Sequence, residues 1–229
     1  MTDRTALLAA VLAAPDDDAP RLVFADWLEE NGEPERAAFI CCQIELARLG
    51  DNWIDFAVGP HAADYPEFED ERDWRAVTDR LAGRERELLQ RHDNEWKIWC
   101  PYTARGGIDG REIECHHSPA GQMFRRGFVE TVEMDADDWL AHGDAILAAH
   151  PATEVRLTTW PNIPFTRPGE AHLKVGNRFV SSCRASYGDA VTDCLRHLWP
   201  VVRTWHLPPE PVTLEARRLT VNLPLYALG

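Results

Sequence analysis

The first fifty residues place apolar side chains with the period of an α-helix. Apolar positions recur every three or four residues over 3–14, 18–30 and 34–49. Pro15 ends the first stretch, and Asn31-Gly32 supplies a left-handed stop for the second. Three short helices with tight links predict a small bundle. The side chains expected to point inward are Leu7, Leu8, Val11, Leu12, Val23, Phe24, Trp27, Leu28, Phe39, Ile40, Ile44 and either Ala47 or Leu46.

Residues 122–229 combine strand and helix periods. Alternation over 128–134 predicts a strand, a helix follows from Asp135 to the residue before Pro151, and alternation resumes over 155–159. Such a unit joins parallel strands, and its length of about 25 residues falls within the period of leucine-rich repeats. Weaker patterns predict a strand over 173–181, a helix over 189–199, and strands over 201–207 and 214–223.

The middle of the chain has one regular element, a helix predicted over 74–91. Proline, glycine and acidic residues before it indicate a loop, and the glycine-rich 101–121 indicates a loop with room for a short hairpin. We therefore expect an α+β fold in three parts. They are a helical module at 1–50, a linker and helix at 51–121, and an α/β domain of leucine-rich-repeat-like units at 122–229.

The net charge of the chain disfavours nucleic acid as a partner. The formal net charge is −14, and most acidic side chains lie in the first hundred residues, which repels nucleic-acid backbones. The sequence contains neither a secretory leader pattern nor an apolar run long enough to cross a membrane. We therefore expect a cytoplasmic protein that binds neither nucleic acid nor membranes, with its six cysteines reduced.

Cysteine and histidine residues give the strongest candidate for chemistry. Cys115, His116 and His117 are consecutive, and Cys100 lies fifteen residues earlier. Thiolates and imidazoles are the usual ligands of zinc, but the two-residue gap between cysteines that usually begins a zinc site is absent. Buried thiols and surface histidines remain the alternative. No catalytic or cofactor-binding motif is recognised, so no catalytic residue and no cofactor is expected.

Three further features of the sequence are weaker indications of function. His92-Asp93 occurs in metal phosphohydrolases, but a histidine there also suits a helix C-terminus. Cys194 and His197 lie three residues apart on one predicted helix and could form half of a metal site. The tryptophans outside the helix stripes indicate either a partner surface or core packing. They are Trp53, Trp96, Trp99, Trp160 and Trp205.

The first module resembles a known family. The segment Arg-Leu-Val-Phe-Ala-Asp-Trp-Leu-Glu-Glu-Asn-Gly at 21–32, with the segments at 36–40 and 43–49, is similar to the bacterial repeat-companion domain. More weakly, residues 84–96 resemble the helix that often follows that domain, and residues 124–157 resemble the entry into a repeat array. The resemblance implies a short helical module that often precedes leucine-rich or other repeats. It implies no catalytic residue.

Asp26 lies inside the most specific part of this resemblance, between Phe24 and Trp27. Its place on the helix predicts either capping or an ion pair with Arg21 or Arg36.

These observations favour a non-enzymatic protein-interaction or scaffold protein whose partner is another protein. The alternative is a zinc-dependent or thiol-dependent enzyme that uses Cys100, Cys115, His116 and His117.

Overall fold

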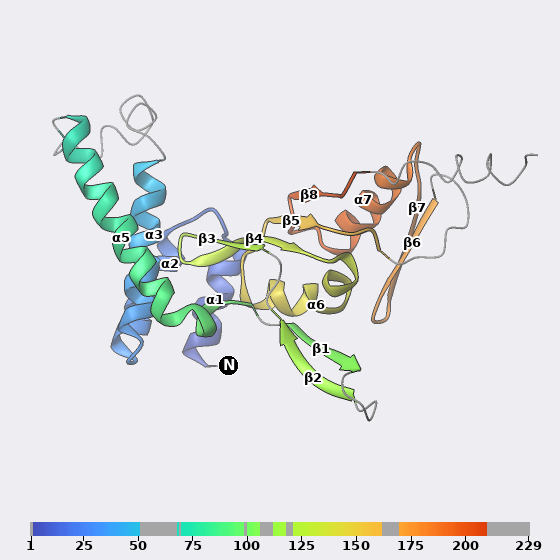
Figure 1. The fold of residues 1–229 in the computed structure, drawn as a ribbon, viewed down its shortest axis with the longest axis horizontal. Helices are drawn as coiled ribbons and strands as arrows, with labels where there is room; N and C mark the ends of the chain where they lie inside the picture. The colour runs from blue at the N-terminus through green and yellow to red at the C-terminus, as the bar shows by residue number, and fades with distance from the viewer. Residues whose placement is uncertain are drawn as a thin grey trace, which may run out of the picture.

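The computed structural model describes residues 2–50, 68, 70–98, 100–105, 112–117, 121–161 and 170–209. Within these ranges the chain forms six helices and eight strands. The predicted mixture of helices and strands is therefore confirmed. Figure 1 shows the long helices at one end of the molecule, the main sheet in the middle, and β6, β7 and α7 at the other end.

The helical module contains the three predicted helices, which are α1 (Asp3–Ala13), α2 (Ala19–Glu30) and α3 (Pro34–Leu49). Thr2 caps α1, and Gly32 takes the left-handed φ of 88° that the stop after α2 requires. The core of the module also includes one residue of the sheet, Phe128. Its other buried members are Val11, Phe24, Ala25, Leu28, Ala37, Ile40 and Ile44.

The buried face of α2 differs from the prediction in two places. Val23 was expected inside but is 52% exposed, whereas Arg21 is fully buried. Asp26 is exposed, and Arg21 and Arg36 bind groups of the sheet instead, so the predicted pairing of Asp26 is wrong. The buried face of α2 therefore includes the charged Arg21 in place of Val23.

Helix α5 (Glu71–Trp96) packs along α3 and is longer than predicted. The carboxylate of Asp70 caps its first turn by accepting from the backbone of Arg72 and Asp73. Its N-terminal half covers Leu49 with Trp74, Val77 and Leu81, in a small apolar cluster.

The main sheet has four strands in the order β3-β4-β5-β8. Strands β3 and β4 form an antiparallel hairpin, and β4, β5 and β8 run parallel. Helix α6 makes the crossover between β4 and β5, as predicted, and Asp135 caps it. The elements are β3 (Gly121–Arg125), β4 (Phe128–Met134), α6 (Ala136–Ala149), β5 (Glu154–Leu157) and β8 (Thr204–His206).

Three described elements lie between β5 and β8 along the chain. The strand predicted over 173–181 is in fact an antiparallel pair, β6 (Glu170–Val175) and β7 (Arg178–Cys183). The prediction was wrong because it read through the turn at Gly176, where φ is 55°. Helix α7 (Tyr187–Leu198) packs on this pair, and Ser186 caps it. The strand predicted over 214–223 lies outside the described residues.

A separate hairpin pairs β1 (Cys100–Arg105) with β2 (Glu112–His117), where a short hairpin was expected. The described part of the chain has no helix that is both long and apolar enough to span a membrane. The division of the chain at residues 50 and 121 remains a prediction.

Candidate functional site

The hairpin between β3 and β4 ends in a turn of unusual backbone conformation. Arg125 pairs with Phe128, which leaves Arg126 and Gly127 as a two-residue loop. Both take a left-handed conformation, with φ of 50° and 85°, as a type I′ turn requires. Glycine does this freely, but the conformation costs a residue such as Arg126 about 1 kcal/mol. We call residues 125–128 the arginine turn.

The backbone of the arginine turn is bound by side chains of the helical module. Arg21 donates to the carbonyl oxygen of Arg126 at 3.0 Å. Arg36 donates to the carbonyl oxygen of Gly127 at 2.6 Å. The Gly127 N–H donates to Gln43 Oε1 at 2.7 Å. Three residues from two helices therefore recognise one peptide turn through its main chain.

Buried charges reinforce this attachment. Glu130 of β4 accepts from Arg21 at 2.8 Å and from Arg126 Nε at 3.2 Å. Burial raises the pKa of Glu130, and the charges of Arg126 and Arg21 oppose that rise. Burial likewise lowers the pKa of Arg21, while the charge of Glu130 opposes the change. Two guanidinium groups around one carboxylate keep the buried Glu130 paired, although Arg21 Nε has no hydrogen-bond partner in the described part of the chain.

Arg126 also ties the turn to the loop between α1 and α2. Its Nη1 donates to the carbonyl oxygen of Asp16 at 2.9 Å. Arg203, which precedes β8, reaches the same loop and donates to Asp16 Oδ1 at 2.9 Å. The loop therefore contacts both the arginine turn and the residue that precedes β8.

The turn fits the module closely. A Cβ atom on Gly127 would lie 2.4 Å from Cγ1 and 2.8 Å from Cα of Ile40. Distances this short are incompatible with packed atoms, so only glycine fits at this position.

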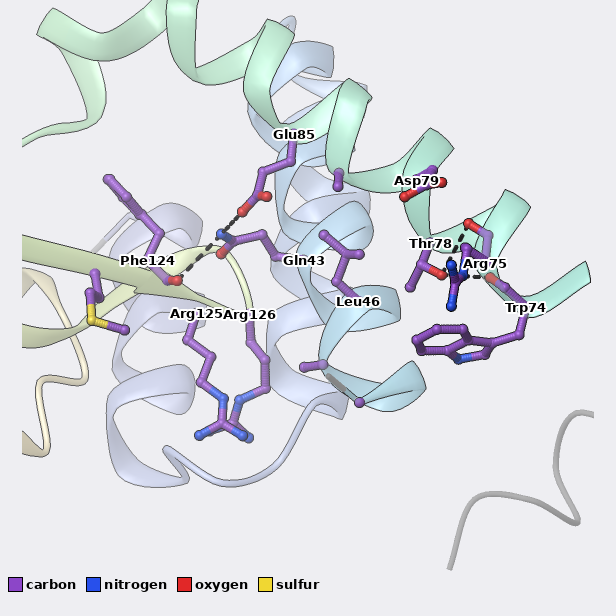
Figure 2. Close-up of a pocket in the computed structure, with 14 residues that line it drawn as sticks. Gln43, Leu46, Trp74, Arg75, Thr78, Asp79, Glu85, Phe124, Arg125 and Arg126 are labelled. Atoms are coloured by element: carbon purple, nitrogen blue, oxygen red, sulfur yellow. Dashed lines mark hydrogen bonds between the residues drawn. The ribbon is translucent and has the colours of Figure 1, made fainter. Parts of the chain in front are cut away.

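A groove of about 880 Å³ opens beside the turn, between α3, α5 and β3. Figure 2 shows Gln43 between Glu85 and Phe124, with hydrogen bonds of 2.6 Å to the Glu85 carboxylate and 3.4 Å to the Phe124 carbonyl. Arg125 and Arg126 extend away from this contact in the figure. Within the described residues, the side chain of Arg125 has no hydrogen bond or ion pair, although its charge acts on Glu130, and Met123 is 60% exposed. The groove therefore presents an available cation and an apolar side chain.

A second cavity of about 970 Å³ lies on the other side of the two arginines. Asp16, Asp17 and Asp18 line it, together with Glu45 and Arg48. Because Arg125 and Arg126 line both cavities, they form the ridge between an open groove and an acidic recess.

The predicted metal ligands lie on the separate hairpin. The backbone register pairs Cys100 with His117, Pro101 with His116, and Tyr102 with Cys115. Their side chains lie outside the described part of the structure. The register brings Cys100 beside the Cys115–His117 segment, and the zinc hypothesis stays a prediction.

The other candidate half-site, Cys194 and His197, does not form in the structure. Cys194 is buried and points its thiol at the carbonyl oxygens of Ala171 and Val180, at 3.6 and 3.8 Å, whereas His197 is exposed. Among the described residues, no group of three or more His, Cys, Asp or Glu is placed to hold a metal ion.

Three of the described thiols are weakly acidic. Burial raises the pKa of Cys42 to about 11, and burial also raises the pKa of Cys41 and Cys194. A thiol must lose its proton to act as a nucleophile, so these three are poorly suited to catalysis at neutral pH.

His92 takes a structural position. Its ring contacts Glu35 Oε2 at 2.5 Å and Glu95 Oε2 at 2.9 Å, and it stacks on Trp96. The hydrogen bonds to Glu95 and Glu35 raise the pKa of His92, although burial opposes this. The side chain of Asp93 lies outside the described residues. His92 therefore joins α5 to α3.

Packing explains the tryptophans that the structure describes. Trp205 joins Trp139 and Trp199 in a cluster with ring centroids 5.5 to 6.1 Å apart. Trp160 packs against Tyr187, and Trp96 packs against Phe39. The other two candidates, Trp53 and Trp99, lie outside the described residues.

Sequence reasoning missed Arg21, Arg36, Gln43 and Glu130 as a group. One signal could have found part of it. Glu130 shares the inward face of its strand with Val132 and Met134, so a buried carboxylate there required a cationic partner. Nothing in the periodicity indicated which arginine that would be.

Comparisons with protein families, with curated proteins and with solved structures found no match to this chain. The resemblance to the repeat-companion domain therefore stays a prediction from the motif.

Proposed function

We propose that this chain is a non-enzymatic scaffold that binds a partner protein in the groove between α3, α5 and β3. One observation carries the proposal. Arg21, Arg36 and Gln43 are directed at the backbone of the arginine turn and not at one another or at an open reaction centre. The helical module thus acts as a peptide-binding clamp that holds the α/β part in a fixed position.

The groove has the chemistry of a protein-binding surface. It combines the exposed Met123 with the cation of Arg125. Arginine and methionine are among the residues enriched in protein interfaces. The parallel strands β4, β5 and β8, with α6 as a crossover, support a leucine-rich-repeat-like arrangement behind this surface.

Site-specific photo-crosslinking in cells tests the proposal. A photoreactive residue at Met123 should capture a defined protein, and the additional substitution Arg125→Glu should abolish the product. Phe179 is the matched control, because it is 65% exposed on β7 at the other end of the molecule. Products that are the same at both positions, or no product at Met123, would contradict the proposal.

The zinc-dependent or thiol-dependent enzyme remains the second candidate, since the β1–β2 register brings Cys100 next to His117 and near Cys115. Elemental analysis of the purified chain decides it. This candidate requires equimolar zinc that is lost in Cys100→Ser and Cys115→Ser variants. A zinc-free chain with the full wild-type fold would exclude the zinc form.

A further inference from the structure

A third cavity lies where the helical module meets the α/β part, apart from the groove described above. Its volume is about 360 Å³, within the range of small-molecule sites. Six elements supply its walls, which are α1, α2, α3, the end of α5, β4 and the end of α6. The residues that line it are Arg4, Leu8, Phe24, Glu33, Arg36, Glu95, Trp96, Lys97, Phe128, Ala149 and His150.

Arg36 brings an incompletely satisfied cation to this cavity. Its Nη2 donates to the Gly127 carbonyl, but its Nη1 is buried and has no hydrogen-bond partner in the described part of the chain. None of the described carboxylates forms an ion pair with it. Burial, with the nearby charge of Arg4, lowers the pKa of Arg36 to about 10, so it stays protonated at neutral pH. A buried donor of this kind favours an anionic acceptor.

Aromatic rings surround the same guanidinium group. The Arg36 Cζ atom lies 4.9 Å from the ring centroid of Trp96 and 5.6 Å from that of Phe128. Phe39 and Phe124 lie 5.3 and 6.0 Å away. These faces stabilise the charge and hold the guanidinium plane in place, but they provide no oxygen for Nη1. The donor is therefore fixed in position before any ligand arrives.

His150 adds a second unsatisfied polar atom. Its Nδ1 is buried without a partner among the described residues. Burial and the charge of Arg36 lower the pKa of His150 to about 4, so the ring is neutral at physiological pH. A neutral imidazole can donate one hydrogen bond from Nδ1 without adding a further charge to the site.

The carboxylates of the lining already have partners. Glu33 pairs with Arg4, and Glu95 pairs with His92. The charge of Glu33 opposes part of the fall in the pKa of Arg36, but neither carboxylate forms an ion pair with Arg36 in the described part of the chain. The rest of the wall combines the cationic Lys97 with the apolar Leu8, Phe24 and Ala149.

We propose that this cavity binds a carboxylate attached to an apolar or aromatic group, with one carboxylate oxygen accepting from Arg36 Nη1 and the other from His150 Nδ1. The apolar group lies against Leu8, Phe24 and Phe128. The site is independent of the partner groove, and the same chemistry fits a small carboxylic acid or the C-terminus of a peptide.

Titrations followed by NMR of the Trp96 indole and the His150 ring test the proposal on the full chain. The probes are 3-phenylpropanoate, the peptide Ala-Ala-Phe with a free carboxylate, and the carboxamide of each. At least one of the two free carboxylates should bind saturably. Its carboxamide should bind with an affinity lower by about tenfold or more, because one charge-assisted hydrogen bond is lost. Binding by the small acid identifies a free acid as the ligand, and binding by the peptide alone identifies a chain end.

Variants locate the binding. Leu8→Trp fills the cavity and should abolish saturable binding, and His150→Ala should weaken it about tenfold. Val23→Trp adds the same bulk at an exposed site outside the cavity and should bind as the wild type does. Arg36→Lys also removes the contact to Gly127, so this variant is informative only if its NMR spectrum is that of a folded protein. The conclusions from the other variants do not depend on it. Equal binding of acid and amide, retained binding in Leu8→Trp, or no binding of either acid by the folded wild type would overturn the proposal.

Discussion

The helical module and the α/β part stabilise their interiors differently. The α/β part has a large apolar core of its own, with Trp139, Trp199 and Trp205 in mutual contact. The helical module has a smaller core that is completed by Phe128 from the sheet, and it buries Arg21 completely. The sheet supplies both the ring of Phe128 and Glu130, the partner of the buried Arg21. The stability of the helical module therefore depends on the α/β part. The contrast shows that the arginine turn determines whether the two regions act as one unit.

Substitution of Gly127 should give the largest loss in the free energy of unfolding, because it disrupts the arginine turn that joins the two regions. Gly127→Ala combines a positive φ with a Cβ atom 2.4 Å from Ile40, and we expect a loss of more than about 4 kcal/mol in the free energy of unfolding. Gly176→Ala is the matched control in the α/β part. Its φ is 55° with no atom within 4 Å of the added Cβ, so only the backbone cost of about 1 kcal/mol applies. Urea denaturation measures both, and equal losses would show that the close fit is absent.

The buried ion pair gives the next largest effect. Arg21→Met leaves Glu130 buried with one guanidinium partner fewer and should cost about 3 kcal/mol. The double variant Arg21→Met, Glu130→Met should recover part of that loss, because no buried carboxylate remains unpaired. Arg156→Met removes a solvent-exposed pair with Glu154 in the α/β part and should cost less than about 1 kcal/mol. The comparison fails if the double variant is no more stable than Arg21→Met.

Gln43 tests the hydrogen bonding of the turn separately from its charge. Gln43→Met keeps the side-chain volume but leaves the buried N–H of Gly127 without an acceptor, which should cost about 2 kcal/mol. In the α/β part, Ser182→Ala removes a 2.6 Å hydrogen bond to Asp193, which retains its bond to Arg184. That loss should stay below about 1 kcal/mol. Denaturation curves compare the two, and a larger loss for Ser182→Ala would reverse the proposed order.

Local sequence signals predicted the elements of both regions. Asp135 as a cap, Gly32 as a stop and the alternation of β4 were all confirmed, because each depends on residues close together in the chain. The turn at Gly176 was missed because alternation continues on both sides of it.

Contacts between the regions were not predictable in the same way. Arg21 and Glu130 lie 109 positions apart, and no periodic pattern records such a distance. Val23 has the hydropathy of a core residue, yet it is exposed. The buried face of α2 is instead the one that directs Arg21 toward Glu130. Several of the residues that join the two regions are polar side chains on otherwise apolar faces, and sequence periodicity alone treats them as exceptions.

The smallest effect on stability should come from the contacts of His92 that link α5 to α3. These contacts lie at the surface, whereas the arginine turn is buried. Hydrogen bonds to Glu95 and Glu35 raise the pKa of His92 above its ordinary value of 6.5. The stabilising contribution of protonated His92 is therefore fully present below about pH 6.5. It is lost as pH rises through the higher pKa of His92 in the folded state. Bonds to His92 and Arg91 lower the pKa of Glu35, so its contribution disappears again as pH falls through that lowered value. The stability of the wild type relative to His92→Gln, measured by urea denaturation from pH 5.5 to 9, should decline across this range. Because water screens the exposed carboxylates, the decline should be smaller than any loss at the turn, and two curves that stay parallel would show that His92 carries no such charge.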